Sequence, residues 1–194
     1  YGRSDLAAEY YDRRLFNHAT YQDLINHGRK PFLIINATDI TSGSQFPFIQ
    51  DQFDLLCADL APVPIARAVA SSSAFPGLLT PLTIQNYAGH CGFSDARWVT
   101  LAEEDRRDNI DRALRADRRR SYYQIEVPRP GSRKYIHLMD GGVADNIGLR
   151  GPLYAVASTD PTYSILRKIN NEEIDKLVVI VVNAAAAAAS LFSG

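Results

Sequence analysis

Residues 135–148 have the sequence Tyr135-Ile-His-Leu-Met-Asp140-Gly141-Gly142-Val-Ala-Asp145-Asn146-Ile-Gly148. The apolar part predicts a strand that delivers a carboxylate, Asp140, at its C-terminal end, where ligands and catalytic groups collect in α/β sheets. The two glycines that follow permit backbone conformations that other residues avoid, and they allow close approach by another group. Two interpretations stay open: a site carboxylate, or a strand that leaves the sheet through a turn in which Asp140 bonds its own backbone.

The rest of the chain alternates between strand and helix patterns, which favours an α/β fold. Short apolar runs predict buried strands, and we expect residues 32–36, 136–140 and 177–182 to lie in one sheet that is covered by helices. The other predicted strands cover residues 45–49, 122–127 and 134–139, and the predicted helices cover residues 4–14, 20–27, 65–74 and 100–120.

Local signals indicate where several of these elements begin or end. Ser4 is the predicted N-cap of the first helix. Thr100 and Glu103 match a capping box that opens the charged helix. Pro47 restricts its strand to a sheet edge. Pro76 ends the preceding Ala-rich helix, whose small side chains let it lie close against a sheet.

The composition is that of an ordinary globular protein: 46% of the 194 residues are hydrophobic and 22% are charged, and the length suggests one domain. Because 21 basic residues accompany 22 acidic ones, the formal net charge of −1 gives no electrostatic reason to expect a nucleic-acid-binding protein. No apolar run reaches the roughly 18 residues of a membrane-spanning helix. The chain begins with Tyr1 and has no basic-then-apolar leader, so we expect the natural N-terminus to lie upstream.

Residue types that bind metals or react with oxidants form no recognisable cofactor site. Cys57 and Cys91 lack CxxC spacing; one disulfide between them stays open, so they leave the compartment unknown. No histidine has metal-ligand spacing with another or with a cysteine, and the four are His18, His27, His90 and His137. We expect His137 to be a packed or hydrogen-bonded side chain, and we expect neither a metal nor an organic cofactor.

Two polar clusters have a structural explanation that we prefer. Ser71–Ser73 lie at the end of a predicted helix, where small residues form close-packed interfaces more often than they supply a nucleophile. Arg118–Arg120, with Tyr122 and Tyr123, form a basic-aromatic cluster that could touch phosphate or a membrane surface. A solvated helix end explains that cluster better.

Three motifs follow one another in the chain: Asn36-Ala-Thr-Asp39, Ala68-Val-Ala-Ser-Ser-Ser-Ala74-Phe75-Pro76-Gly77, and Asp140-Gly-Gly-Val-Ala-Asp-Asn146-Ile-Gly148. In this order they resemble the motifs of patatin-like phospholipases. Two further segments, Tyr10-Tyr-Asp-Arg-Arg-Leu-Phe16 and Phe53-Asp-Leu-Leu-Cys-Ala-Asp59, resemble bacterial members of that family. The resemblance spans roughly residues 10–152.

The resemblance implies a three-layer α/β/α fold and a Ser–Asp catalytic dyad that hydrolyses acyl esters of lipids. Asp140, with Gly141 and Gly142, matches the family's Asp-Gly-Gly/Ala motif, so Asp140 is the expected base of the dyad. A serine hydroxyl needs a positioned base to become nucleophilic, and a shielded carboxylate can accept that proton without a histidine. The implied partner is a phospholipid or another acyl lipid at a membrane surface, and no cofactor is implied.

The chain departs from the family at the nucleophile. A Gly-x-Ser-x-Gly elbow and an upstream Gly-rich loop for the oxyanion are both absent, and the sequences around Ser4 and Ser94 lack the second glycine. We therefore expect residues 1–183 to be the C-terminal part of one patatin-like domain, incomplete at its N-terminal side, with the nucleophile upstream. Residues 184–194, which include Ala184–Ala189, form an uncertain segment in which side-chain identities are in doubt.

Two other hypotheses remain. The first is a non-catalytic patatin-like module that binds lipid or a protein partner. The second is an unrelated α/β domain in which the Asp-Gly-Gly sequence is only a turn. Substitution of the upstream serine would favour the first, and an Asp140 that does not face a cleft at the sheet's C-terminal edge would favour the second.

Overall fold

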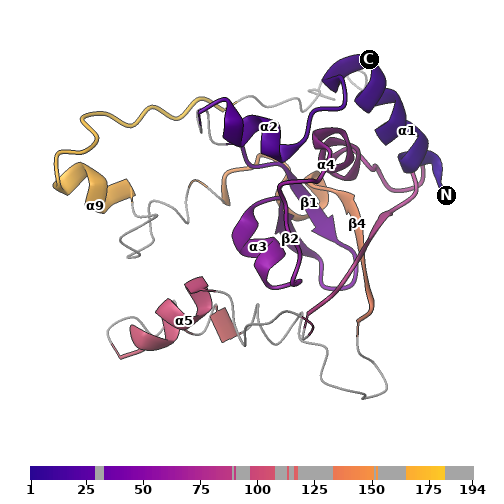
Figure 1. Ribbon diagram of the computed structural model, residues 1–194. Coiled ribbons are helices and arrows are strands. Elements are labelled where there is room, and N and C mark those ends of the chain that lie inside the picture. The colour runs from indigo at the N-terminus through magenta and orange to yellow at the C-terminus, as the bar shows by residue number, and fades with distance from the viewer. Residues whose placement is uncertain are drawn as a thin grey trace, which may run out of the picture. The chain divides into compact units, whose positions relative to one another are not determined.

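A computed structural model describes residues 1–28, 33–88, 90, 97–107, 113, 116–117, 133–150, 152 and 165–181. The chain divides into two compact units, Tyr1–Asn146 and Ile147–Gly194. The elements of the first unit, in chain order, are α1 (Arg3–Tyr11), the π-helix η1 (Asp12–Phe16), α2 (Tyr21–Asn26), β1 (Asn36–Asp39), β2 (Ser44–Pro47), α3 (Gln50–Asp54), α4 (Ile65–Ser72), β3 (Leu82–Gln85), α5 (Arg97–Glu104), β4 (Tyr135–Asp140) and α7 (Gly142–Asp145) (Figure 1).

The first unit is built on a four-stranded sheet with the strand order β2-β1-β4-β3, in which each pair of neighbours is antiparallel. The mixture of strands and helices agrees with the predicted α/β class at this coarse level. Strand β2 lies at an edge, as Pro47 predicted. The register aligns apolar side chains across the sheet, in the pairs Ala37 with Phe46, Leu82 with Leu138, and the partly buried Ile84 with Ile136.

Helix α4 lies between the sheet and α1: it contacts β1 and β4 on one side and α1 on the other (Figure 1). Small side chains make this close approach, because Ala70 of α4 packs with Ala8 of α1 and with Leu82. The helix ends at Ser72, before Pro76, so the predicted Ala-rich helix is confirmed. Among the described helices, none has the length and apolar character that crossing a bilayer requires.

Strand β1 differs from the predicted strand at 32–36. Residues 33–35 are not in a strand, Leu33 and Ile34 are exposed, and the strand begins at Asn36. The observed strand therefore shares only Asn36 with the predicted one, and three of its four residues are polar. Thr38 and Asp39 are wholly buried because other groups partner their polar atoms, a situation that hydrophobic patterns do not report.

Two predicted helix starts are also wrong. The first helix is capped at Gly2, whose amide donates to Asp5 at 2.8 Å, while Ser4 lies inside the helix with its hydroxyl donated to the carbonyl oxygen of Thr80. Helix α5 begins at Arg97, so Thr100 is an interior residue. Glu103 cannot complete a capping box there, because its carboxylate binds Arg106 at 2.7 and 2.8 Å.

The second unit contains α9 (Ile165–Asn170) followed by residues 171–181 without regular structure. The predicted strand at 177–182 is wrong over 177–181: these residues form no strand, and Ile180 is 84% exposed. β-Branched composition favours a strand only where a neighbouring strand supplies hydrogen bonds, and the described residues of this unit contain none. The predictions for residues 122–127, Arg118–Arg120, Tyr122, Tyr123 and Ala184–Ala189 lie outside the described residues.

A buried ion pair holds β1 in the sheet. The carboxylate of Asp39 is wholly buried and binds the guanidinium of Arg133 through two contacts of 2.8 Å. The amide of Thr41 donates a further hydrogen bond to Oδ1 at 3.0 Å. Because Arg133 lies just before β4, the pair connects β1 to the segment that leads into the next strand.

Arg133→Met should lower the free energy of unfolding by roughly 3–5 kcal/mol, because it leaves the buried Asp39 carboxylate without its cation. Urea denaturation followed by circular dichroism measures the change. Arg13→Met is the matched control, since Arg13 pairs with Glu9 at 3.8 Å on the surface and should lose about 1 kcal/mol or less. Equal losses in the two variants would contradict the assignment.

Cys57 is disulfide-bonded, and the sequence contains one other cysteine, Cys91, which lies outside the described residues. A bond within the chain closes a loop of about 35 residues, for which chain entropy predicts a stabilisation of about 3–4 kcal/mol. Dithiothreitol should therefore lower the thermal midpoint of the oxidised protein. Cys57→Ser should unfold at that lower temperature with and without dithiothreitol, and a reductant effect that persists in Cys57→Ser would exclude the disulfide as its cause.

Candidate functional site

Asp140 is the last residue of β4 and is half-buried. Its main chain is held from two sides: the amide donates to the carbonyl oxygen of Ala74 at 3.0 Å, and the carbonyl oxygen accepts a hydrogen bond from Thr38 Oγ1 at 2.7 Å. Ala74 follows α4 and Thr38 is in β1. Two elements that are distant in the sequence therefore fix the position of this residue.

The two carboxylate oxygens of Asp140 have different surroundings. Oδ1 accepts a hydrogen bond from the amide of Gly142 at 2.7 Å, which is the self-bonded turn considered from the sequence. Among the described residues, none donates a hydrogen bond to Oδ2. Asp140 can therefore take part in the turn through Oδ1 while Oδ2 accepts no hydrogen bond from a described residue.

Gly141 is enclosed by main-chain atoms. Its amide donates to the carbonyl oxygen of Ser72 at 3.1 Å, and a Cβ at this position would lie 2.3 Å from the carbonyl oxygen of Asn36. The φ angle of −62° is one that any residue adopts. Glycine is needed here for close approach, which the sequence predicted, and not for an unusual backbone conformation.

Gly142 meets a different kind of obstacle. A Cβ there would lie 2.9 Å from Oδ1 of Asn146 and 3.0 Å from Oδ1 of Asp140, and both of these atoms are ends of side chains. Side-chain ends can shift by a few tenths of an ångström where a main chain held in a sheet cannot. This position therefore tolerates alanine better than position 141 does.

The three serines at the end of α4 have unequal roles. Ser71 is 1% exposed and donates its hydroxyl to the carbonyl oxygen of Arg67 at 2.9 Å. Ser73 donates to Ala70 at 3.4 Å. Ser72 is half-buried, and its Oγ lies on the side that faces Gly141. Of the other serines considered, Ser4 is wholly buried and Ser94 lies outside the described residues.

Sequence reasoning assigned no role to Thr38 and Asn36, although both lie beside the Asp140 turn. Thr38 is 0% exposed, and its hydroxyl also accepts a hydrogen bond from the amide of Ala144 at 3.1 Å. The side-chain oxygen Oδ1 of Asn36 is buried and has no hydrogen-bond partner among the described residues. The only sequence signal was that both belong to the Asn36-Ala-Thr-Asp39 motif.

His137 Nδ1 and Thr83 Oγ1 form a hydrogen bond of 2.9 Å across the β3–β4 pair. The prediction of a hydrogen-bonded histidine is therefore confirmed. His18 pairs with Asp12, and His27 bonds the carbonyl oxygen of Asp23. Within the described part of the chain, no three His, Cys, Asp or Glu side chains lie close enough to hold a metal ion.

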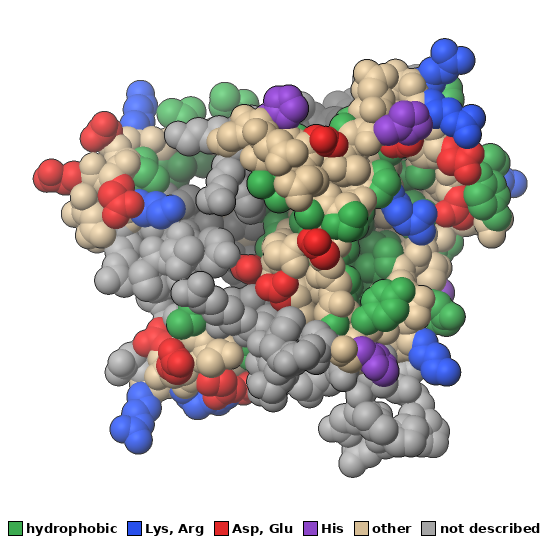
Figure 2. All heavy atoms as spheres, in the orientation of Figure 1, with side chains coloured by type: hydrophobic (Ala, Val, Ile, Leu, Met, Phe, Trp, Pro, Cys, Tyr) green, Lys and Arg blue, Asp and Glu red, His purple; other side chains and the backbone are tan. Residues whose placement is uncertain are grey.

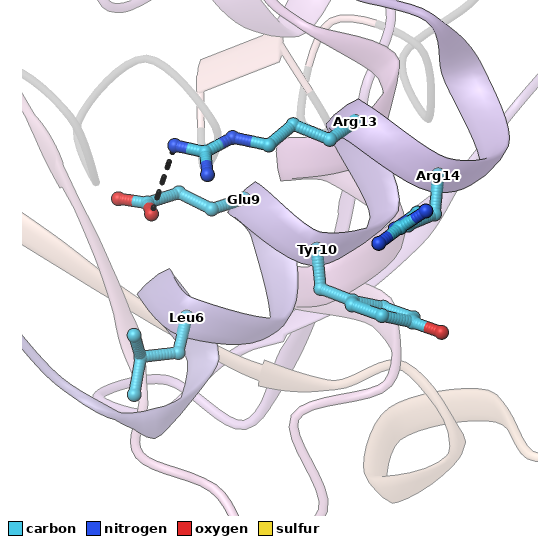
Figure 3. A pocket seen from close by; sticks show the side chains of 5 residues that line it. All are labelled: Leu6, Glu9, Tyr10, Arg13 and Arg14. Atoms are coloured by element: carbon cyan, nitrogen blue, oxygen red, sulfur yellow. Dashed lines mark ion pairs between the residues drawn. The ribbon is translucent and has the colours of Figure 1, made fainter.

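A hollow of about 300 Å³ lies on α1 and η1 (Figure 3). It is lined by Leu6, Glu9, Tyr10, Arg13 and Arg14. The ion pair between Arg13 and Glu9 lies within this lining. On the face drawn in Figure 2, basic and acidic side chains of the described residues are interspersed. The hollow therefore has a mixed charge and contains no residue of the three motif segments.

Two exposed apolar residues lie in the segments next to Asp140. Phe75, which follows the Ala74 whose carbonyl oxygen accepts a hydrogen bond from the Asp140 amide, is 60% exposed, and Val143, three residues after Asp140, is 56% exposed.

Comparisons with protein-family models, with curated proteins and with solved structures find no match to this chain.

Gly141→Ala should lower the free energy of unfolding by roughly 1–3 kcal/mol, because the added methyl group meets the main chain of Asn36. Gly142→Ala should lower it by clearly less, since only side-chain ends have to move. Guanidinium denaturation of both variants measures the difference. Equal losses would mean that the contact with Asn36 is not what excludes a side chain at position 141.

Proposed function

We propose that this chain acts in a serine acyl-ester hydrolase of lipids, of the patatin type, in which Asp140 is the general base. The observation that carries the proposal is that the two carboxylate oxygens of Asp140 differ in their hydrogen bonding. Oδ1 is anchored by the Gly142 amide, and no described residue donates a hydrogen bond to Oδ2. A carboxylate that is oriented by one oxygen can accept a proton on the other.

In the proposed reaction, a serine hydroxyl transfers its proton to Oδ2 of Asp140 while the serine oxygen attacks the carbonyl carbon of the ester. The protonated Asp140 carboxyl returns the proton to the departing alcohol, and the acyl group remains on the serine. A water molecule then gives a proton to the same carboxylate as its oxygen attacks the acyl-serine carbonyl carbon, and the fatty acid leaves as the serine oxygen takes that proton back. The sequence Gly-x-Ser-x-Gly does not occur in the 194 residues, so this proposal assigns the nucleophile to sequence upstream of them.

Apolar groups beside the carboxylate support an acyl lipid as the substrate. Phe75 and Val143, in the segments next to Asp140, are each more than half exposed, and contact with an acyl chain would remove this surface from water. The residue order of the three motifs is the other support. The proposed reaction needs no cofactor.

The alternative is a non-catalytic module that binds lipid or a protein. The hydrogen bond from Gly142 to Asp140 Oδ1 is sufficient to explain an aspartate at this position as part of a turn, and this explanation suits a binding module and an unrelated α/β domain equally. The two proposals differ in what the negative charge of Asp140 does, since a turn needs only an acceptor oxygen.

Asp140→Asn tests this difference in the full-length product of the gene that encodes the chain. Asparagine keeps an acceptor for the Gly142 amide but is not a base, so hydrolysis of a p-nitrophenyl ester should fall roughly 10²- to 10⁴-fold. The thermal midpoint should change little, because the turn is preserved.

Asp145→Asn is the matched control, since Asp145 lies five residues further on, at the end of α7. Its rate should stay close to that of the unmodified protein. Ester hydrolysis that is unchanged in a folded Asp140→Asn protein would reject Asp140 as the base. An unmodified protein that hydrolyses no ester would favour the binding module.

A further inference from the structure

One buried hydroxyl joins the two ends of the Asp140 turn. Thr38 is 0% exposed, and its Oγ1 donates to the main-chain oxygen of Asp140 at 2.7 Å. The same oxygen accepts a hydrogen bond from the amide of Ala144 at 3.1 Å. Asp140 ends β4 and Ala144 lies in α7, so the hydroxyl spans the point at which the chain passes from strand to helix.

The hydroxyl is held by a rigid support. Thr38 is in the middle of β1, where it is opposite Met139 of β4 and Gln45 of β2. Hydrogen-bonded strands on both sides fix its main chain, and branching at Cβ restricts the side-chain rotamer. The position of Oγ1 is therefore set by the sheet and not by the turn that it binds.

The turn itself has little intrinsic stability. Helix α7 has four residues, Gly142–Asp145, and a single helical turn does not form alone in water. The amide of Ala144 is shared between Thr38 Oγ1 and the carbonyl oxygen of Gly141, which lies 3.2 Å away. External support is needed to keep the Gly142 amide directed at the carboxylate of Asp140.

We infer that Thr38 is a positioning residue that clamps Asp140 to α7 and so fixes the direction of the Asp140 carboxylate. The part of this inference that concerns catalysis rests on the proposed function. Thr38 touches neither the reacting atoms nor the substrate; it acts through the main chain of Asp140 and through α7.

Thr38→Val and Thr38→Ser separate the hydroxyl from the shape of the side chain. Valine has nearly the same shape without the hydroxyl, whereas serine keeps the hydroxyl without the methyl group. By amide hydrogen exchange, the Ala144 and Gly142 amides should exchange about 3- to 10-fold faster in Thr38→Val than in the unmodified protein, and serine should restore protection. If Thr38→Val does not fold, Thr38→Ala takes its place and is compared with Thr38→Ser in the same way.

In the full-length protein, Thr38→Val should lower kcat about tenfold or more with KM nearly unchanged, because the base is displaced while substrate binding is not. Thr38→Ser should recover most of kcat. Thr83→Val is the matched control: Thr83 bonds His137 on the neighbouring strand pair, and its loss should leave kcat unchanged.

The outcomes separate this inference from the proposed function. A full-length protein in which Asp140→Asn does not impair hydrolysis rejects the proposed function, and amide exchange then decides the clamp alone. Unchanged exchange in a folded Thr38→Val protein overturns the clamp. If kcat depends on Asp140 but is the same in the unmodified protein and in Thr38→Val, the positioning role is overturned. It is also overturned if kcat is equally low in Thr38→Ser and Thr38→Val.

Discussion

A carboxylate that is wholly removed from water needs a cation, and Asp39 meets this requirement through Arg133. The pair lets β1, a strand of mainly polar residues, lie in the interior of the sheet between β2 and β4. Without it, the central strand would carry an unpaired charge among buried apolar side chains. Because Arg133 lies just before β4, the pair also connects β1 to the start of the strand that ends at Asp140.

Polar groups in β1 therefore have two separate tasks. Asp39 attaches the strand to the segment before β4, and Thr38 attaches the end of β4 to α7. A buried hydroxyl or carboxylate with all its partners in place is directional in a way that apolar packing is not. This directionality explains how a four-residue strand can determine the geometry of a turn more than 100 positions later in the sequence.

The elements that the sequence predicted well are those whose signal is local. The Ala-rich helix α4 and strand β4 have regular apolar patterns and clear end signals, and both form near the predicted positions. Strand β1 was displaced because its burial depends on Arg133, a residue almost 100 positions away. The run at 177–181 failed for the opposite reason: its composition favours a strand, but a strand also needs a neighbour, which composition does not specify.

The same distinction applies to the candidate site. Asp140 and its two glycines could be selected from the sequence because they are adjacent along the chain. Thr38 could not be selected in this way, and Ser72 could be noted only as one of three serines at a helix end, because only the fold brings these two residues to the turn. Their residue types carry no signal of their own, since buried threonines and helical serines are common in packed interfaces.

Gly141 is required for packing, independently of the role of the aspartate that precedes it. The obstacle to a side chain at this position is the carbonyl oxygen of residue 36, which every amino acid carries. A different side chain at position 36 therefore leaves the obstacle in place, and the need for glycine at position 141 does not depend on the role of residue 140. Replacement of Asp140 would leave the requirement for glycine at position 141 unchanged. A substitution at position 141 therefore tests how closely β4 approaches β1, whereas a substitution at position 140 tests the proposed chemistry and leaves that approach unchanged.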